Sequence, residues 1–137
     1  MHSHVWRFDR ETLVQIGPVV DVLLVGDRPG AQPGTTRALI DTGADVSCIA
    51  PSLVTAMELR RVGPGKMGNA DTDAYNLRII FCGTTLPECR GTVLPLPRLD
   101  EAEDGAFRVI LGRHFLASGT LTYDGDAGTV TWTFTSA

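Results

Sequence analysis

The chain has 137 residues, 43% of them hydrophobic, and a formal net charge of −4. This length favours one domain with its own buried core, so we expect residues 1–137 to form a single domain. The acidic balance excludes nucleic-acid binding through a general positive charge, and no apolar run approaches the ~18 residues of a membrane span, so we expect neither partner.

The first part of the chain is predicted to form short strands separated by turns. Residues 1–10 are expected to be a loosely ordered N-terminal segment. The apolar runs 12–16 and 19–27 flank a Gly-Pro pair and predict two strands or one bent strand. Two prolines and two glycines in 28–34 indicate a turn, and 35–41 predicts a further strand.

The middle of the chain contains the clearest helical segment. Residues 51–59 predict one or two turns of helix, with proline at an early position and serine as a possible cap. A polar, glycine-rich segment, 62–73, then precedes two expected strands at 74–83 and 89–97. The acidic residues of 98–106 indicate a solvated surface loop.

The last part of the chain predicts a buried strand at 107–112, a short helix at 113–117 and a hairpin at 120–134. In the hairpin, Val130, Trp132 and Phe134 alternate with threonines, which predicts one buried and one solvated face. Short strands dominate the whole chain, so the fold class is predicted to be all-β.

The three cysteines, Cys48, Cys82 and Cys89, include no Cys-x-x-Cys pair. An odd, sparse set is a poor disulfide framework and a poor zinc site. We therefore expect free thiols, no metal and no cofactor. Disulfides are rare in the cytosol and the first residues lack the pattern of a signal peptide, so the expected location is cytoplasmic.

One segment carries a chemical signal. In "ALIDTGAD", three apolar residues lead to Asp41, and Thr42-Gly43-Ala44 then turns the chain. An acid in apolar surroundings is costly unless the protein uses it or neutralises it. A second segment much later, "VILGR", places Gly112 and Arg113 directly after an apolar strand.

Together the two segments resemble the retropepsins, the retroviral-type aspartic proteases and their cellular and bacterial relatives. Residues 75–97 are similar to the strand pair that follows the flap in that family, so the resemblance covers roughly 12–134. It implies a closed β-barrel, one lobe of the acid protease fold, with one or two short helices and a two-fold dimer.

The resemblance also implies residue roles. Asp45 is expected to pair with Arg113 and to lie near the substrate backbone, and 63–73 is expected to be the flap, a hairpin that covers the substrate. The implied catalytic residues are Asp41, Thr42 and Gly43. The implied substrate-binding residues are Ala44, Asp45, Met67, Gly68, Asn69, Ala70, Asp71 and Thr72. The implied supporting residues are Ile110, Leu111, Gly112 and Arg113.

The implied activity is that of an aspartic endopeptidase acting on a peptide or protein. Two nearby carboxylates cannot both ionise comfortably, so they share a proton; one activates water while the other protonates the carbonyl, as in the aspartic proteases. The chain has one Asp-Thr-Gly, so the resemblance implies a homodimer in which each subunit contributes Asp41.

The flap segment departs from the family pattern, because Pro64 and its charged residues predict a more polar lid than retroviral flaps. His114 departs as well, since relatives often carry Asp or Asn there. These departures keep a second hypothesis open, an inactive retropepsin-fold module for dimerisation or peptide binding. A small β-barrel with an incidental Asp-Thr-Gly does not explain the "VILGR" segment.

Overall fold

A computed structural model describes residues 2–101 and 106–134. These residues form ten strands and four short helices, more helices than the one or two expected. In chain order the elements are β1 (His2–Arg7), α1 (Arg10–Gln15), β2 (Val19–Val25), β3 (Gly34–Ile40), β4 (Ser47–Ile49), α2 (Pro51–Ala56), β5 (Arg61–Met67), β6 (Ala70–Phe81), β7 (Cys89–Pro95), α3 (Arg98–Glu101), β8 (Val109–Leu111), α4 (Arg113–Leu116), β9 (Gly119–Asp124) and β10 (Thr129–Phe134).

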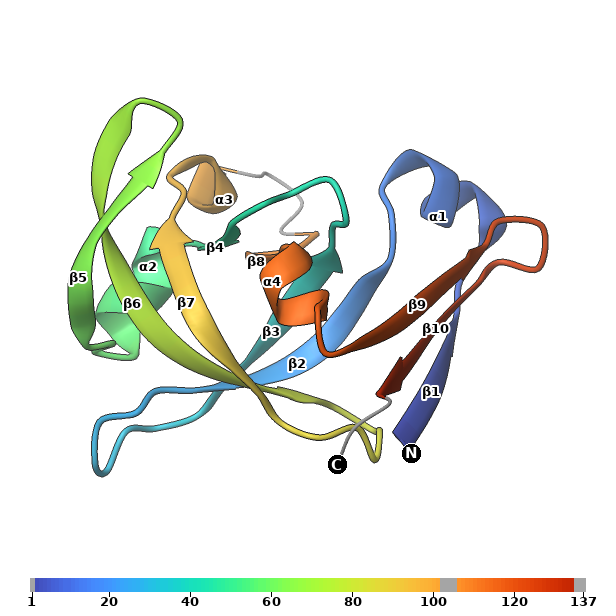
Figure 1. Cartoon of the computed structure of the whole chain (residues 1–137), viewed down its shortest axis with the longest axis horizontal. Helices are drawn as coiled ribbons and strands as arrows, with labels where there is room; N and C mark the ends of the chain where they lie inside the picture. The colour runs from blue at the N-terminus through green and yellow to red at the C-terminus, as the bar shows by residue number, and fades with distance from the viewer. Residues whose placement is uncertain (1, 102–105, 135–137) are drawn as a thin grey trace.

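Six of the strands close into a barrel (Figure 1). They follow the order β2-β3-β8-β4-β7-β6, and β6 pairs again with β2 to close the ring. The pairings β3–β8 and β4–β7 are parallel, whereas the other pairings of the ring are antiparallel. The predicted all-β closed barrel is therefore confirmed.

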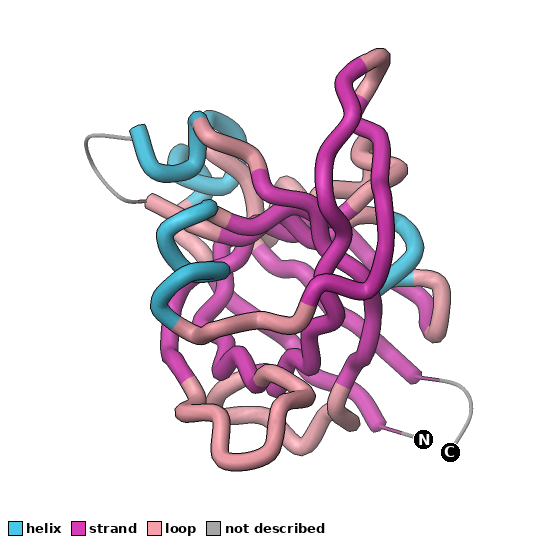
Figure 2. Tube along the Cα trace, turned by 90° about the vertical axis from the view of Figure 1, so that its left-hand side faces the viewer, coloured by secondary structure: helices cyan, strands magenta, loops and turns pink. Residues whose placement is uncertain are grey.

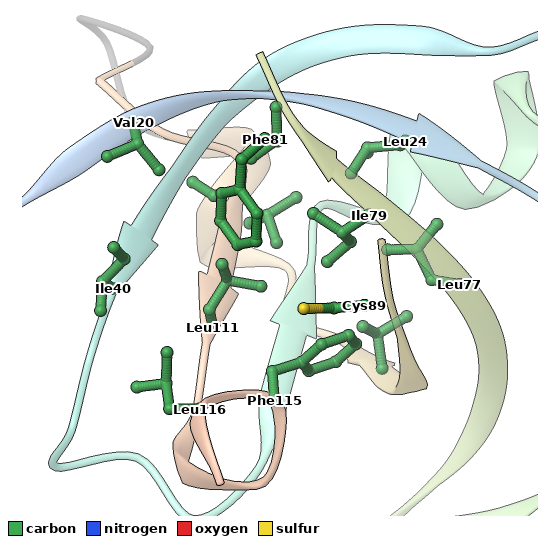
Figure 3. Packing of buried hydrophobic residues seen from close by; sticks show 14 of the residues in the cluster. Val20, Leu24, Ile40, Leu77, Ile79, Phe81, Cys89, Leu111, Phe115 and Leu116 are labelled. Atoms are coloured by element: carbon green, nitrogen blue, oxygen red, sulfur yellow. The ribbon is translucent and has the colours of Figure 1, made fainter. Parts of the chain in front are cut away.

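Alternating apolar residues of the barrel strands fill its interior. Leu24 of β2, Ile79 of β6 and Leu111 of β8 are fully buried, and Figure 3 shows them converging with Phe115 of α4. Burial of side chains of this size stabilises the fold by about 1.5–3 kcal/mol each, before the entropy cost of ordering them.

A second, three-stranded sheet of order β1-β10-β9 packs beside the barrel (Figure 1). Its β9–β10 hairpin matches the prediction, and Val130, Trp132 and Phe134 are buried, as their alternation indicated. The ring of Trp132 meets that of Phe81 edge-on, with centroids 5.0 Å apart. This contact joins the sheet to the barrel core.

The expectation that residues 1–10 are loosely ordered is wrong for the described part. Strand β1 pairs with β10 along its whole length, from His2 opposite Phe134 to Arg7 opposite Thr129. The ladder satisfies the backbone groups of β1, and the Trp6 ring lies 5.8 Å from that of Phe81. The segment is thus held by both backbone pairing and aromatic packing.

The prediction of a strand at 12–16 is also wrong, because α1 occupies this position. Asp9 caps the helix by accepting a hydrogen bond from the backbone N–H of Thr12 at 3.2 Å. Leu13 is buried while Val14 is exposed, which is the pattern of one apolar helix face. The cap satisfies a backbone donor that would otherwise be unpaired at the helix start, and so favours helix over strand here.

Asp100 is exposed, as the sequence suggested for the acids of 98–106, but it lies in a helix and is held by hydrogen bonds. Residues 98–101 form α3, and 102–105 lie outside the described residues. Asp100 accepts hydrogen bonds from the backbone N–H of Ser52 at 2.9 Å and from Arg108 Nη2 at 2.6 Å. Ser52 is therefore not the N-cap of α2, which is Ala50; its hydroxyl donates to Asp100 instead.

The Asp100 contacts predict a pH-dependent stability. Hydrogen bonds from Ser52, and the charge of Arg108, lower the pKa of Asp100 from its ordinary value of 3.8. A carboxyl with a depressed pKa stabilises the fold above its ordinary pKa and loses this effect as the pH falls through the folded value. We expect D100N to melt at a lower temperature than the wild type at neutral pH, and the difference to shrink under acid conditions.

Thermal unfolding of both proteins from roughly pH 2 to 7 measures this linkage. Asp126→Asn is the matched control, since the Asp126 side chain is 97% exposed and its one ion pair among the described residues is with Arg10, at 3.8 Å. A difference in melting temperature between D100N and wild type that stays constant over the whole pH range would contradict the charge-based account.

Candidate active site

Asp41 lies immediately after β3, where the chain leaves the barrel wall. Its backbone N–H donates to the carbonyl of Leu111 at 2.9 Å, so the parallel β3–β8 pairing extends one residue beyond β3. The neighbouring Ile40 and Leu111 are buried, whereas Asp41 is half-buried. The apolar run therefore delivers the carboxylate to the barrel edge with its backbone fixed.

The turn after Asp41 holds one side of its carboxylate. The N–H of Gly43 donates to Oδ1 of Asp41 at 2.9 Å, and the N–H of Ala44 donates to the Asp41 carbonyl at 3.2 Å. No described residue donates a hydrogen bond to Oδ2. Thr42 and Gly43 are exposed at the apex of the turn. One carboxylate oxygen is thus positioned while the other is free for chemistry.

The segment from β8 into α4 lies directly against this turn. The N–H of Arg113 donates to the carbonyl of Ala44 at 2.8 Å, and Arg113 Nη1 donates to the carbonyl of Thr42 at 3.0 Å. The structure therefore brings the implied catalytic and supporting segments together. The expected Asp45–Arg113 ion pair is not formed among the described residues, because the guanidinium binds the Thr42 carbonyl instead and Asp45 stays exposed.

Ser47 is a supporting residue that the sequence reasoning missed. It is 1% exposed, and its hydroxyl accepts a hydrogen bond from the N–H of Gly112 at 2.8 Å. A buried polar group costs free energy unless it is paired, so this contact fixes β4 against the start of α4. The signal available in the sequence was a single serine between the apolar residues Val46 and Cys48, which does not reveal its distant partner.

Two pockets flank Asp41. The first, of about 430 Å³, is lined by Asp41 together with side chains of α1, β3, α3 and β8. The second, of about 390 Å³, lies between Asp41 and Leu121 and Tyr123 of β9. Among the described residues, Asp41 is the only acidic residue that lines either pocket. The Asp41 carboxylate therefore lies between two pockets.

The expected flap segment is a hairpin of β5 and β6 that projects beyond the barrel (Figures 1 and 2). Its turn is at Gly68 and Asn69, where Gly68 has a φ of +61°. Met67 packs against the apolar cluster of Cys48, Ala50, Leu99 and Ile110, and the last two of these residues line the first pocket. The other implied residues of the tip, 68–72, line neither pocket that contains Asp41.

No cluster of three or more metal-ligating side chains is present among residues 2–101 and 106–134. In the same residues, no helix is long and apolar enough to cross a membrane.

The sequence matches no family model and no curated protein. Among solved structures, a retropepsin-like aspartic protease from Rickettsia conorii superposes with a TM-score of 0.56 at 12% identity, over 95% of this chain and 89% of that one. The chain has the retropepsin-like fold. Two weaker matches come from foamy viruses. The simian foamy virus protease has a TM-score of 0.46 and 15% identity, over 73% and 92% of the two chains.

The other weak match is the foamy viral protease-reverse transcriptase bound to an RNA/DNA hybrid, with a TM-score of 0.47 and 16% identity. The match covers 73% of this chain but only 12% of the other, longer chain. At 12% identity, the match to the Rickettsia conorii protein supports the retropepsin-like fold alone. The roles of the residues therefore depend on the geometry around Asp41.

Proposed function

We propose that the protein is a homodimeric aspartic endopeptidase in which Asp41 of each subunit activates water. The observation that carries this proposal is the setting of Asp41 between two pockets, with Oδ1 held by Gly43 and Oδ2 open. A carboxylate that is fixed on one side and accessible on the other can hold or release a proton without rearrangement.

The second carboxylate comes from the second copy of the chain. Acid proteolysis needs a proton donor and a proton acceptor, and no other described acid lines the Asp41 pockets. The exposed apex, Thr42 and Gly43, is accompanied by exposed apolar side chains, Ile16 at 45% and Tyr123 at 52% exposure. A two-fold contact at this apex would cover these side chains and bring the two carboxylates together.

The reaction then proceeds by proton transfer within the pair. The ionised Asp41 takes a proton from water as the water oxygen attacks the peptide carbonyl, and the protonated Asp41 gives its proton to the carbonyl oxygen. The resulting diol collapses, the C–N bond breaks, and a proton passes to the leaving amine. Each reaction cycle therefore needs one carboxyl of the pair ionised and the other protonated.

The β5–β6 hairpin is proposed to close over the bound peptide. Its turn, α1, α3 and the loop after β3 lie along the upper side of the molecule in Figure 1. Gly68, Asn69 and Asp71 are exposed and contact neither Asp41 pocket, so closure requires the hairpin to move. A closing lid would exclude water and strengthen the electrostatic interactions in the site.

The test combines peptide digestion with a mass measurement. Purified protein is incubated with a broad peptide mixture at roughly pH 4 to 7, the cuts are mapped by mass spectrometry, and native mass spectrometry gives the oligomeric state. Internal cuts by a dimer are expected. Absence of cuts by a confirmed dimer would overturn the proposed enzyme and favour a binding module, for which the open hairpin is the supporting observation.

A further inference from the structure

The first pocket beside Asp41 has an unusual lining for an apolar cleft. Leu39, Phe107 and Ile110 supply apolar walls, and Asp41 lies at one side. Arg98, the first residue of α3, also lines the pocket and is the only cation among its described lining residues. A positive charge is thus placed in the same pocket as the proposed catalytic acid.

The guanidinium of Arg98 has no hydrogen bond or ion pair within the described protein, and the residue is exposed. Other polar groups nearby are engaged. The side-chain amide of Gln15, in the same pocket, donates to Glu11 at 3.2 Å. Because no described residue occupies the guanidinium of Arg98, it can bind an anion, including a carboxylate held by two hydrogen bonds.

The backbone that carries Arg98 is held by the two residues that follow it. Leu99 is 5% exposed and packs with Cys48 and Ile110 in an apolar cluster. Asp100 is bound by Ser52 and Arg108 through the contacts described above. Because α3 is fixed before a ligand arrives, the conformational entropy lost by the protein on binding an anion would be that of the Arg98 side chain alone.

The charges around the pocket mean that binding of an acidic ligand would depend on Arg98. Burial raises the pKa of the Cys48 thiol, the charge of Arg98 lowers it, and the charges of Asp45 and Asp41 raise it, so all three charged groups lie near this thiol. Without Arg98, the charge of Asp41 would be left among the described lining residues of the pocket and would repel a negatively charged side chain. With it, the apolar walls can bind the methylenes of such a side chain while the guanidinium binds its end.

We propose that this pocket selects a glutamate side chain of the substrate, with its carboxylate bound to Arg98 and its methylenes against Leu39 and Ile110. The proposal deepens the proposed function and rests on it. Arg98 is then a specificity-determining residue that touches the substrate without taking part in proton transfer. It predicts that cleavage sites carry glutamate at one fixed position near the cut bond.

The test compares two peptides, each acetylated and amidated at its ends, that differ at one position. This is the position at which the mapped cleavage sites are enriched in Glu, and the peptides carry either Glu or Gln there. For the wild type we expect kcat/KM to be about 10-fold or more higher for the Glu peptide. In Arg98→Gln this ratio should fall to about 1, and Arg98→Glu should favour a Lys peptide. Arg60→Gln is the control, since Arg60 is exposed and lines neither Asp41 pocket.

Each outcome separates the two proposals. If the wild type cuts both peptides equally and D41N cuts neither, the glutamate pocket is overturned and the proposed endopeptidase activity is supported. Equal loss of both activities in Arg98→Gln would show a structural role only. If neither peptide is cut, the binding of labelled peptides to D41N is measured by fluorescence anisotropy. Tighter binding of the Glu peptide than of the Gln peptide, with this preference lost when Arg98→Gln is added, supports the glutamate pocket. Equal binding of the two peptides overturns it.

Discussion

Replacing Asp41 with asparagine is expected to abolish peptide cleavage while leaving the fold intact. Asparagine keeps an oxygen that can accept the hydrogen bond from Gly43, so the turn retains its 2.9 Å contact. It cannot take a proton from water at any working pH. Loss of general acid–base catalysis of this kind lowers rates by about 10²- to 10⁴-fold, and here both subunits lose the group.

The measurement is kcat/KM on a mapped peptide, beside a thermal unfolding curve. D41N should unfold within a few degrees of the wild type, which separates loss of chemistry from loss of structure. Asp126→Asn, altered at a 97% exposed side chain, should cut at the wild-type rate. Cleavage by D41N at a rate near that of the wild type would remove Asp41 from the mechanism.

Replacing Gly112 with alanine is expected to be the most destabilising single change near the site. A Cβ at this position would lie 2.6 Å from the carbonyl oxygen of Val46 and 2.8 Å from that of Ala44. Both are backbone atoms, so no side chain can move aside. Overpacking of this kind costs about 3 kcal/mol. The strain would also disturb the N–H of Gly112, which donates to Ser47.

Urea or guanidinium unfolding of Gly112→Ala measures this cost directly. The matched control is Gly63→Ala, because a Cβ at Gly63 meets no atom within 4 Å. The control should change stability by less than about 1 kcal/mol, the intrinsic difference between glycine and alanine. If the two variants were equally stable, the close approach of Gly112 to the catalytic turn would not constrain the fold.

The features predicted correctly from the sequence are those encoded by residues close together in the chain. The alternation of Val130, Trp132 and Phe134 is a local pattern and located the last hairpin. The apolar run before Asp41 located β3, and the run before Gly112 located β8. Period and turn chemistry specify such elements, because each depends on neighbours within a few residues.

The features that were missed depend on partners far apart in the sequence. β1 is ordered by a ladder to β10 at the other end of the chain, and Asp100 binds Ser52, 48 positions earlier. The Ser47–Gly112 contact spans 65 positions. The helix α1 is a different case, because its cap joins Asp9 to Thr12, only three positions later. Here the apolar residues that follow led to the prediction of a strand.

The central claim is that two copies of Asp41, one from each chain, form a single catalytic site. Titration of D41N into a constant amount of wild type, after subunit exchange and well above the dimer dissociation constant, tests it most directly. Random pairing predicts that activity falls with the wild-type fraction, to about one tenth at a ninefold excess of D41N. Activity that stays unchanged at every ratio would contradict the claim, because each chain would then carry a complete site of its own.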